Sequence, residues 1–389
     1  MPSDKVYHDR NLQIIFGITL MAVLGVSSVA PALPTIMQTL QISHTQVALL
    51  ISVYTLPGIF LSPVAGILSD RVGRKRLVVP ALFFFGITGG ACALTTSLSM
   101  LLVLRAFQGF SAAILGTLNL TLIGDLFSGT RRAEAMGINA SILSFGTFSY
   151  PLIGGTLATF AWNYPFLMPL VAIPVGFLAL RYLNNPEPKS QGSLTSYLSG
   201  AWSYLKDPKV QSVFLLTVIG FGLLYGVMIT YNPLYLNSAF GASPFTIGII
   251  SASMSLVTAL VASQLGRLAK VFSMASLMKL GFLVMALPMA AIPLIPNLGL
   301  EVLPVVVWGA GWAIVFPAVQ VYLTTKAPPE YRAIFMALNG TTLYLGQTIG
   351  PVFMGMAFTL GGYEAIYFSG AAVALLVAAV GFIGGRIMR

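Results

Sequence analysis

Residues 66–76 read Gly-Ile-Leu-Ser-Asp-Arg-Val-Gly-Arg-Lys-Arg and form a short charged stretch between two long apolar ones. Gly73 permits a tight turn, and the small Gly66 allows a neighbouring helix to come close. The acid and the bases can form ion pairs at a helix end. Asp125, at the end of a later apolar stretch, is a candidate partner for Arg74. We expect a latch that holds one conformation and then releases it. Its residues are Gly66, Asp70, Arg71, Gly73, Arg74, Lys75 and Asp125.

The composition of the whole chain indicates a membrane protein. Of its 389 residues, 57% are hydrophobic and 8% are charged, and the mean hydropathy is +0.89. A soluble domain carries about 25% charged residues. A chain this long and this apolar has lipid as its main solvent, and twelve of its apolar stretches are long enough to cross a bilayer as helices. They are residues 12–37, 45–68, 77–96, 99–125, 133–159, 163–183, 210–237, 244–268, 274–295, 300–325, 331–360 and 363–385.

The positions of the charges support twelve spans. Every Lys and Arg except Arg105 falls near a chain end or in alternate loops, and the opposite loops carry only Glu301 and Glu364. By the positive-inside rule, both termini are expected in the cytoplasm. Because the net charge of +10 is spread over short loops, it predicts no nucleic-acid partner.

Motifs for chemistry are scarce. The single cysteine, Cys92, allows no disulfide framework. The sequence shows no nucleotide-binding loop, no metal-ligand cluster and no nucleophile with a matching base. We therefore expect neither an enzyme nor a bound metal or other cofactor. The first apolar stretch is too long for a cleavable signal peptide.

The chain repeats itself at a spacing of 200 residues. Gly-Ile-Leu at 66–68 returns as Gly-Arg-Leu at 266–268, and the Arg, Met and Asn of 132–139 return at 332–339. The repeat predicts two parallel six-helix halves, residues 1–183 and 210–389. Residues 184–209 form a linker whose apolar positions predict a short amphipathic helix, either on the inner membrane surface or packed on the bundle.

The charged stretch resembles the loop signature of the major facilitator superfamily, G-x-L-x-D-R-x-G-R-[RK], at every specified position. The first span is also similar to the family pattern, with Leu24-Gly25 followed by Pro31-Ala-Leu-Pro34. The resemblance implies an all-α membrane protein with twelve transmembrane helices in two pseudo-symmetric six-helix bundles. It also implies a transporter that works by alternating access of the two halves. The second copy of the loop lacks the acid and the basic cluster, so we expect a weak second latch or none.

Arg105 is the one basic residue inside a predicted span. An Arg at the centre of a membrane helix costs about 2.5–3.5 kcal/mol on insertion scales, so it should face a cavity or polar partners, backbone carbonyls included. The surrounding sequence is similar to the family's span-4 motif R-x-x-Q-G, which implies a part in proton coupling. The coupling candidates are Arg105, Gln108 and Asp125.

The fifth predicted span is similar to the motif of the family's exporters, G-x-x-x-G-P-x-x-G-G. Tyr150 stands where the second Gly of that motif is expected, which weakens the implied direction of transport. Gly and Pro bend a helix and let neighbours pack closely, so small-residue packing without directional meaning is the alternative. The kink is expected at Gly146, Pro151, Gly154 and Gly155.

Polar and aromatic side chains in the spans are few and are candidates for the substrate cavity. They are Gln108, Asn119, Asn139, Tyr225, Tyr231, Asn232, Trp308, Trp312, Gln320, Asn339, Tyr344 and Gln347. None of the ten Asp and Glu residues falls in the middle of a predicted span. We therefore expect a neutral or amphipathic substrate, or an anionic one that meets Arg105.

These features favour a secondary exporter of small hydrophobic or amphipathic compounds. The chain resembles the 12-span drug:proton antiporter (efflux) branch of the family, which implies that a proton gradient drives export. The alternative is an importer or uniporter of a small polar or anionic nutrient, and a non-transporting sensor on the same fold is a third class. We expect a monomer in a bacterial inner (plasma) membrane, with lipid and a small-molecule substrate as its partners. Gating and ion coupling are expected in the N-terminal half, and substrate contacts in the C-terminal half.

Overall fold

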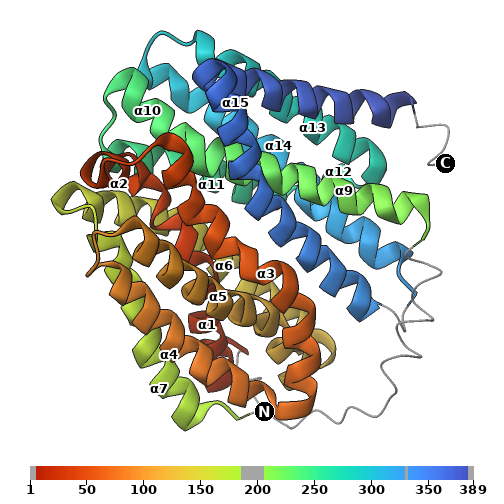
Figure 1. The fold of residues 1–389 in the computed structure, drawn as a ribbon. Coiled ribbons are helices and arrows are strands. Elements are labelled where there is room, and N and C mark those ends of the chain that lie inside the picture. The colour runs from red at the N-terminus through yellow and green to blue at the C-terminus, as the bar shows by residue number, and fades with distance from the viewer. Residues whose placement is uncertain (1–5, 185–205, 329–331, 384–389) are drawn as a thin grey trace.

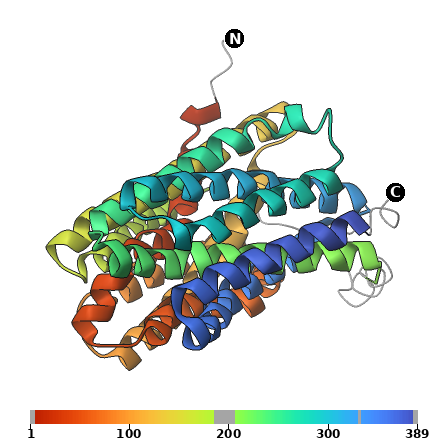
Figure 2. The ribbon, with the colours of Figure 1, turned by 90° about the horizontal axis from the view of Figure 1, so that it is seen from above.

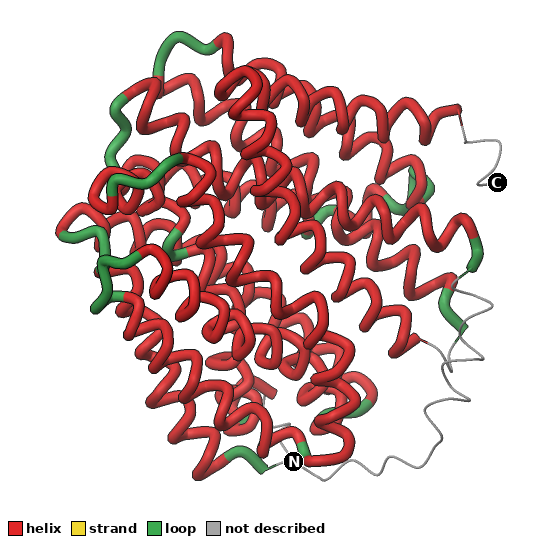
Figure 3. The backbone as a smooth tube through the Cα atoms, viewed as in Figure 1, coloured by secondary structure: helices red, strands yellow, loops and turns green. Residues whose placement is uncertain are grey.

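The computed structural model describes residues 6–184, 206–328 and 332–383 as helices joined by short loops (Figure 3). The predicted amphipathic helix of the linker falls mostly on residues 185–205, which lie outside this part. The N-terminal elements are η1 (Val6–His8), α1 (Arg10–Ser27), η2 (Ala30–Ala32), α2 (Leu33–Leu40), α3 (His44–Val72), α4 (Arg74–Cys92), α5 (Leu98–Leu126), α6 (Gly129–Phe160), η3 (Tyr164–Val171) and α7 (Ala172–Tyr182). The C-terminal elements are α9 (Pro208–Leu223), η4 (Leu224–Tyr231), α10 (Asn232–Phe240), α11 (Pro244–Ala262), α12 (Leu265–Leu268), α13 (Met274–Ala291), η5 (Ile292–Leu294), α14 (Leu298–Lys326) and α15 (Arg332–Ile383).

Twelve membrane crossings account for these elements. By length and hydropathy, 10 helical segments of the described residues could cross a membrane. The long helix α6 supplies a further crossing, although its first turns carry three charged side chains. The helix α15 is broken at Gly361 and Gly362, where the backbone is not helical, and therefore supplies two crossings. This agrees with the twelve spans predicted from the sequence.

The repeat at 200 residues is visible in the helix boundaries. α3 and α11 begin at His44 and Pro244, and their N-caps are the equivalent residues Ser43 and Ser243. Each cap side chain accepts a hydrogen bond of 3.2 Å from the backbone N–H three residues later, which satisfies a free donor at the helix start. α4 and α13 begin at 74 and 274, and α5 and α14 at 98 and 298. The two halves therefore share one plan.

The two halves lie as separate groups of helices, red to yellow-green and green to blue in Figure 1. Within the C-terminal group, α15 runs beside α9 in both views (Figures 1 and 2). We call the helix ends that carry Arg71, Arg131 and Lys326 the basic end, and the opposite ends the far end.

Side chains of the two halves meet at the far end. The Gln38 amide donates to the side-chain oxygen of Asn237 over 2.9 Å, and the hydroxyls of Thr55 and Thr348 lie 2.9 Å apart. The ring of His44 stacks on Phe358, with 4.4 Å between centroids. α6 and α11 approach most closely, because a Cβ atom on Gly155 or on Gly248 would overlap a backbone carbonyl of the other helix. Glycine is required at both positions for this packing.

The basic ends of α3 and α15 diverge (Figure 1). The contact between Gly340 and Ser62 lies on the basic-end side of the middle of α3, 10 residues before its end at Val72. Further along α3, no atom lies within 4 Å of the position that a Cβ would take on Gly66. The close helix approach predicted at Gly66 is therefore not made in this conformation, in which the halves touch at the far end and separate at the basic end.

Gly248→Ala should weaken the closure of the far end. The added methyl group would overlap the carbonyl oxygen of Pro151, so α6 and α11 must move apart. Spin labels at the exposed positions Thr39 and Ser238, one in each half, should report a longer mean distance by pulsed electron paramagnetic resonance. The labels require a Cys92→Ala background, because Cys92 is the native cysteine.

Gly137→Ala is the matched control for this prediction. Gly137 also lies in α6, but nothing lies within 4 Å of a Cβ built on it. Its label distance should equal that of the parent protein. An unchanged distance in Gly248→Ala would show that the glycine contact does not hold the far end closed.

Candidate functional site

Arg74 joins three helices of the N-terminal half at the basic end. It is the first residue of α4, and its side chain is buried. The guanidinium forms an ion pair of 2.8 Å with Asp70 and donates a hydrogen bond of 2.7 Å to the Ser69 hydroxyl, both at the end of α3. It also forms an ion pair with Asp125 at the end of α5. The structure thus brings together the pair expected from the sequence.

The remaining residues of the predicted latch lie around this ion pair. Gly73 separates α3 from α4 with a φ of 99°, a left-handed backbone conformation that favours glycine. Arg71 is exposed and Lys75 is half-buried. The partners of Arg74 all belong to the N-terminal half, so the ion pair fixes α3, α4 and α5 to one another. Its part in switching between conformations stays a prediction.

Arg105 is enclosed among α1, α3 and α5 rather than facing an open cavity. Its side chain is 0% exposed. The guanidinium donates hydrogen bonds to the carbonyl oxygens of Leu50 (3.2 Å) and Gly25 (2.8 Å) and to the side-chain oxygen of Gln108 (2.8 Å). The ring of Tyr54 covers it at 4.1 Å, which allows a cation–π interaction. One terminal nitrogen, Nη2, keeps no hydrogen-bond partner within the described residues.

Asp125 cannot act together with Arg105 in this structure. Both residues lie on α5, and the 20 positions between them correspond to about 30 Å along a helix. Asp125 is engaged by Arg74 at the basic end, whereas Arg105 lies near the far end. The sequence suggested this pair as a coupling unit, and the structure corrects that expectation.

Three tyrosines from both halves gather between the bundles. Tyr54 lies on α3, Tyr225 on η4 and Tyr344 on α15, and their phenol groups are close enough to interact electrostatically. The ring of Tyr344 packs against Gly58, and its hydroxyl reaches Gly116 on α5. We call these three residues the tyrosine cluster. It lies next to Arg105, because Tyr54 covers the guanidinium.

Only part of this cluster is evident from the sequence. Tyr344 and Tyr225 were among the candidates because they are aromatic residues in predicted spans, but Tyr54 was not among them. Tyr225 lies in η4, an eight-residue π-helical segment (Leu224–Tyr231) between α9 and α10. Such segments are rare and concentrate at functional sites. No local sequence signal marks the π-helix, and the partnership of Tyr54 with Arg105 depends on helix packing.

Trp308 and Trp312 stack on one face of α14, as their spacing predicts. Their ring centroids are 6.1 Å apart, and Phe316 continues the stack at 5.6 Å from Trp312. Phe221 of α9 meets the Trp312 ring edge-on at 4.8 Å. Trp308 is fully buried and Trp312 nearly so. In this conformation the two tryptophans are packed inside the C-terminal bundle, and Phe316 is the partly exposed end of the ladder.

Asn119 and Asn339 belong to matching interhelical hydrogen-bond networks. In the N-terminal half, Thr19 donates to Asn139 over 2.6 Å and Asn119 donates to Thr19 over 3.3 Å. In the C-terminal half, Thr217 donates to Asn339 over 3.0 Å, and Asn339 donates to Gln320 over 3.1 Å. Their polar groups thus bind neighbouring helices.

Three other cavity candidates are also enclosed. Tyr231 and Asn232 are buried in the C-terminal half, where Asn232 accepts a hydrogen bond of 2.8 Å from the Tyr367 hydroxyl. Gln347 is buried in α15. Of the predicted cavity residues, Tyr344 is the one that reaches from one half to the other and remains partly exposed.

The predicted kink residues of span 5 pack α6 against two neighbours. A Cβ on Gly154 would overlap the carbonyl oxygen of Ser28 just beyond α1, and one on Gly155 would overlap that of Pro244 in α11. Gly146 approaches Leu20 and Val23. Pro151 and the large, buried Tyr150 are accommodated within α6. The small residues therefore allow both the packing within a half and the contact between halves.

Glu301 is not a loop residue, although the charge pattern counted it with the opposite loops; it is the second residue of the predicted span 300–325. It lies in the first turn of α14, its side chain is 0% exposed, and neither carboxyl oxygen has a hydrogen-bond partner within the described residues. The other acid assigned to that side, Glu364, is exposed on α15.

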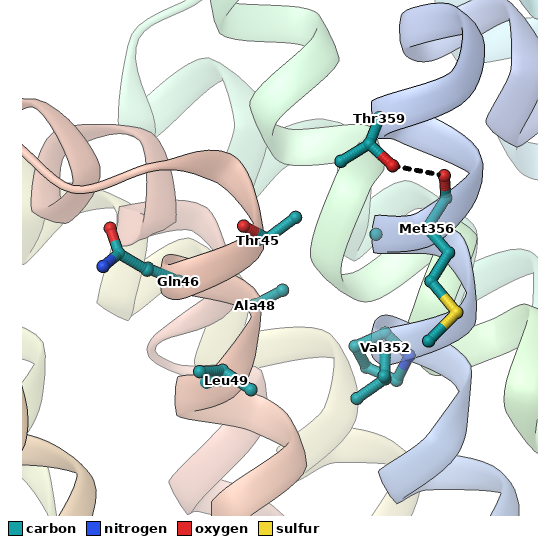
Figure 4. Close-up of a pocket in the computed structure, with 9 residues that line it drawn as sticks. Thr45, Gln46, Ala48, Leu49, Val352, Met356 and Thr359 are labelled. Carbon is teal, nitrogen blue, oxygen red and sulfur yellow. Dashed lines mark hydrogen bonds between the residues drawn. The ribbon is translucent and has the colours of Figure 1, made fainter.

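A crevice of about 250 Å³ lies between α3 and α15 at the far end (Figure 4). Its side chains come from both halves, and Met356 and Val352 face Thr45, Ala48 and Leu49 across it. This crevice belongs to the closed far end, away from the tyrosine cluster.

Comparison with known proteins identifies the family. The chain matches the Major Facilitator Superfamily profile over residues 15–351 and again over residues 232–386. It belongs to the major facilitator superfamily. The chain is accordingly a multi-pass integral membrane transporter of small molecules and not an enzyme.

Similar proteins span nearly the whole chain. Multidrug resistance protein 1 of Bacillus subtilis (strain 168) is 25% identical over 370 residues, 94% of each chain. The class B tetracycline resistance protein of Escherichia coli is 23% identical over 358 residues, 90% of this chain and 89% of that one. The quinolone resistance protein NorA of Staphylococcus aureus (strain N315) is 24% identical and covers 92% of both chains.

Solved structures share the fold. The crystal structure of the nucleoside transporter NupG superposes with a TM-score of 0.82 at 16% identity, over 96% of this chain and 99% of that one. A crystal structure of the peptide transporter POT in complex with sulfate gives a TM-score of 0.82 at 15% identity, over 97% and 95% of the two chains. At such identities the match concerns the fold alone.

Asp125→Asn should destabilise the N-terminal half. The substitution removes a charge partner from the buried Arg74, while Asp70 and Ser69 remain. Because the Asp125 side chain is partly exposed, we expect a loss of about 1–2 kcal/mol of unfolding free energy, below the value for a fully buried pair. The measurement is the thermal unfolding midpoint in detergent.

Arg76→Ala is the control for the ion-pair prediction. Arg76 is exposed and two residues from Arg74, so its loss should leave the midpoint in place. Equal midpoints for Asp125→Asn and the parent protein would mean that the ion pair adds nothing to stability.

Proposed function

We propose that the chain is a proton-driven exporter of small hydrophobic or amphipathic compounds that works by alternating access. The observation that carries this proposal is the site between the halves. It presents three phenol side chains from α3, η4 and α15, and each carboxylate of the described residues lies toward one of the two ends. Aromatic rings with neutral hydroxyls suit a neutral amphipathic ligand better than a cation that needs a carboxylate.

The distribution of basic residues supports one orientation. Apart from Arg105, the Lys and Arg side chains of the described residues lie at the basic end. By the positive-inside rule this end, with both termini, faces the cytoplasm of a bacterial cell. The far end then faces outward, and the structure is an inward-facing conformation. Residues 1–183 and 210–389 form the two moving halves in this proposal, with 184–209 as the linker between them.

Two observations support export: the names of the similar proteins, and the glycine contacts of α6, which is the predicted span 5. Proteins named for resistance to drugs, tetracycline and quinolones match this chain over about nine-tenths of its length or more. The glycines after Pro151 hold α6 against both α1 and α11, so this helix contributes to the contact that must open and close in each cycle.

Transport in membrane vesicles tests the proposal. Inside-out vesicles that contain the protein and have an acidic lumen should accumulate tetracycline or norfloxacin, and a protonophore should abolish the accumulation. Vesicles without the protein are the baseline. If the protein instead loads right-side-out vesicles with a sugar, nucleoside or amino acid and moves neither drug, it is an importer and the export proposal fails.

Arg105→Ala should abolish gradient-driven drug transport and leave the protein folded. The substitution removes the bonds that hold α1 and α3 against α5, beside Tyr54. The Leu50 carbonyl lies within α3 and can keep its helical hydrogen bond. The Gly25 carbonyl near the end of α1 and the side-chain oxygen of Gln108 lose a partner, so the variant should be less stable but still folded. Arg105→Lys should recover part of the activity, because it keeps the charge without the planar fork. Full transport by Arg105→Ala would remove Arg105 from the mechanism.

A further inference from the structure

Glu301 is a buried acid that has no part in the latch, the Arg105 site or the tyrosine cluster. Both of its oxygens lack hydrogen-bond partners within the described residues, and no part of the side chain is exposed. An ionised carboxylate enclosed without partners is strongly disfavoured, because it loses its hydration without a replacement. The enclosed group is therefore tolerated as the neutral acid and would need water or a partner to ionise.

The side chains around Glu301 supply no positive charge within the described residues, and the positive end of the α14 dipole is the one favourable partial charge beside it. The phenols of Tyr235 and Tyr367 lie within electrostatic reach of the carboxyl. Both hydroxyls are already engaged, since Tyr235 donates to the Ile292 carbonyl over 3.3 Å and Tyr367 donates to Asn232 over 2.8 Å. Glu364, the exposed acid near Tyr235, carries the same sign of charge. The described Lys and Arg residues of this half lie at the basic end.

A continuous set of aromatic contacts connects this pocket with the closure between the halves. The Tyr235 ring lies 5.2 Å from that of Tyr367 and 5.4 Å from that of Tyr363. Tyr363 in turn meets the ring of His44, in the N-terminal half, at 5.7 Å. His44 also stacks on Phe358, so the far-end closure and the Glu301 pocket share packed side chains.

We propose that Glu301 is a protonation switch and that its proton controls closure of the far end. This rests on the proton-driven export proposed above. When the far end opens, water reaches the carboxylate, which takes one proton from the outer solution and becomes a neutral carboxylic acid. The neutral acid tolerates enclosure, so the aromatic contacts close. Loss of that proton to water that enters the pocket restores the charge and favours the open far end.

Glu301→Gln is the decisive variant, because glutamine has the shape of the protonated acid and cannot titrate. With spin labels at Thr39 and Ser238, the unsubstituted protein should show a far-end distance that lengthens as the pH rises. In Glu301→Gln the short distance should persist at every pH, and gradient-driven tetracycline transport should fall to the level of empty vesicles. Binding of tetracycline to the purified variant should remain.

Two further variants make the test specific. Glu364→Gln removes an exposed carboxylate from the same end and should keep both transport and the pH response. Glu301→Asp keeps a titratable group and should keep the pH response even if transport is slower, which covers the case in which the glutamine variant does not fold. Infrared difference spectra should show a carboxylic-acid band that disappears on alkalinisation and is missing in Glu301→Gln.

The outcomes separate this proposal from the proposed function. If the unsubstituted protein moves drugs and Glu301→Gln moves them equally well with the same pH response, Glu301 is a structural acid and the inference is overturned. The other outcome is that the unsubstituted protein moves no drug but its far-end distance responds to pH only when Glu301 is present. The role of Glu301 is then supported, and the proposal of drug export is overturned.

Discussion

The free-energy cost of burying a charge in an apolar helix bundle determines how the charged side chains of this protein are placed. Among the described residues, three acidic or basic side chains are buried among the helices, and each meets this constraint differently. Arg74 has two carboxylates and a hydroxyl. Arg105 has two backbone carbonyls, an amide oxygen and the face of a tyrosine ring. Glu301 has no hydrogen-bond partner within the described residues, and two factors can offset its burial: the N-terminal end of α14 and the loss of its charge.

Glycine contacts determine where the two halves can move. α6 and α11 touch backbone to backbone at Gly155 and Gly248, and no side chain intervenes that could adjust to a change in spacing. Such a contact is either made or broken, which suits two discrete conformations better than a continuous range. The empty space beside Gly66 at the basic end is the counterpart. If the halves closed there and opened at the far end, Gly66 could accept a neighbour.

Sequence periodicity and charge were sufficient to predict the architecture, because both are local and repeated properties. Twelve spans, the repeat of 200 and the pairing of Arg74 with Asp125 follow from residues whose spacing is unambiguous. The site between the halves was harder to predict. Tyr54 is one aromatic residue among many in a membrane chain, and only packing shows that it covers Arg105. The burial of Glu301 was missed because it stands at the edge of an apolar run, where sequence alone cannot tell a loop residue from the first turn of a helix.

The duplication places the two enclosed charges of the far end in related positions. α5 and α14 are equivalent helices that begin at Leu98 and Leu298, and Glu301 corresponds to Leu101, one turn before Arg105. The same region of the fold therefore holds a permanent cation in one half and an acid in the other. A guanidinium stays charged under physiological conditions, so Arg105 can organise its helices but cannot carry the proton. If Glu301 is the group that takes up the proton, protonation occurs in the C-terminal half. The charged motifs of the sequence had instead suggested that ion coupling lies in the N-terminal half.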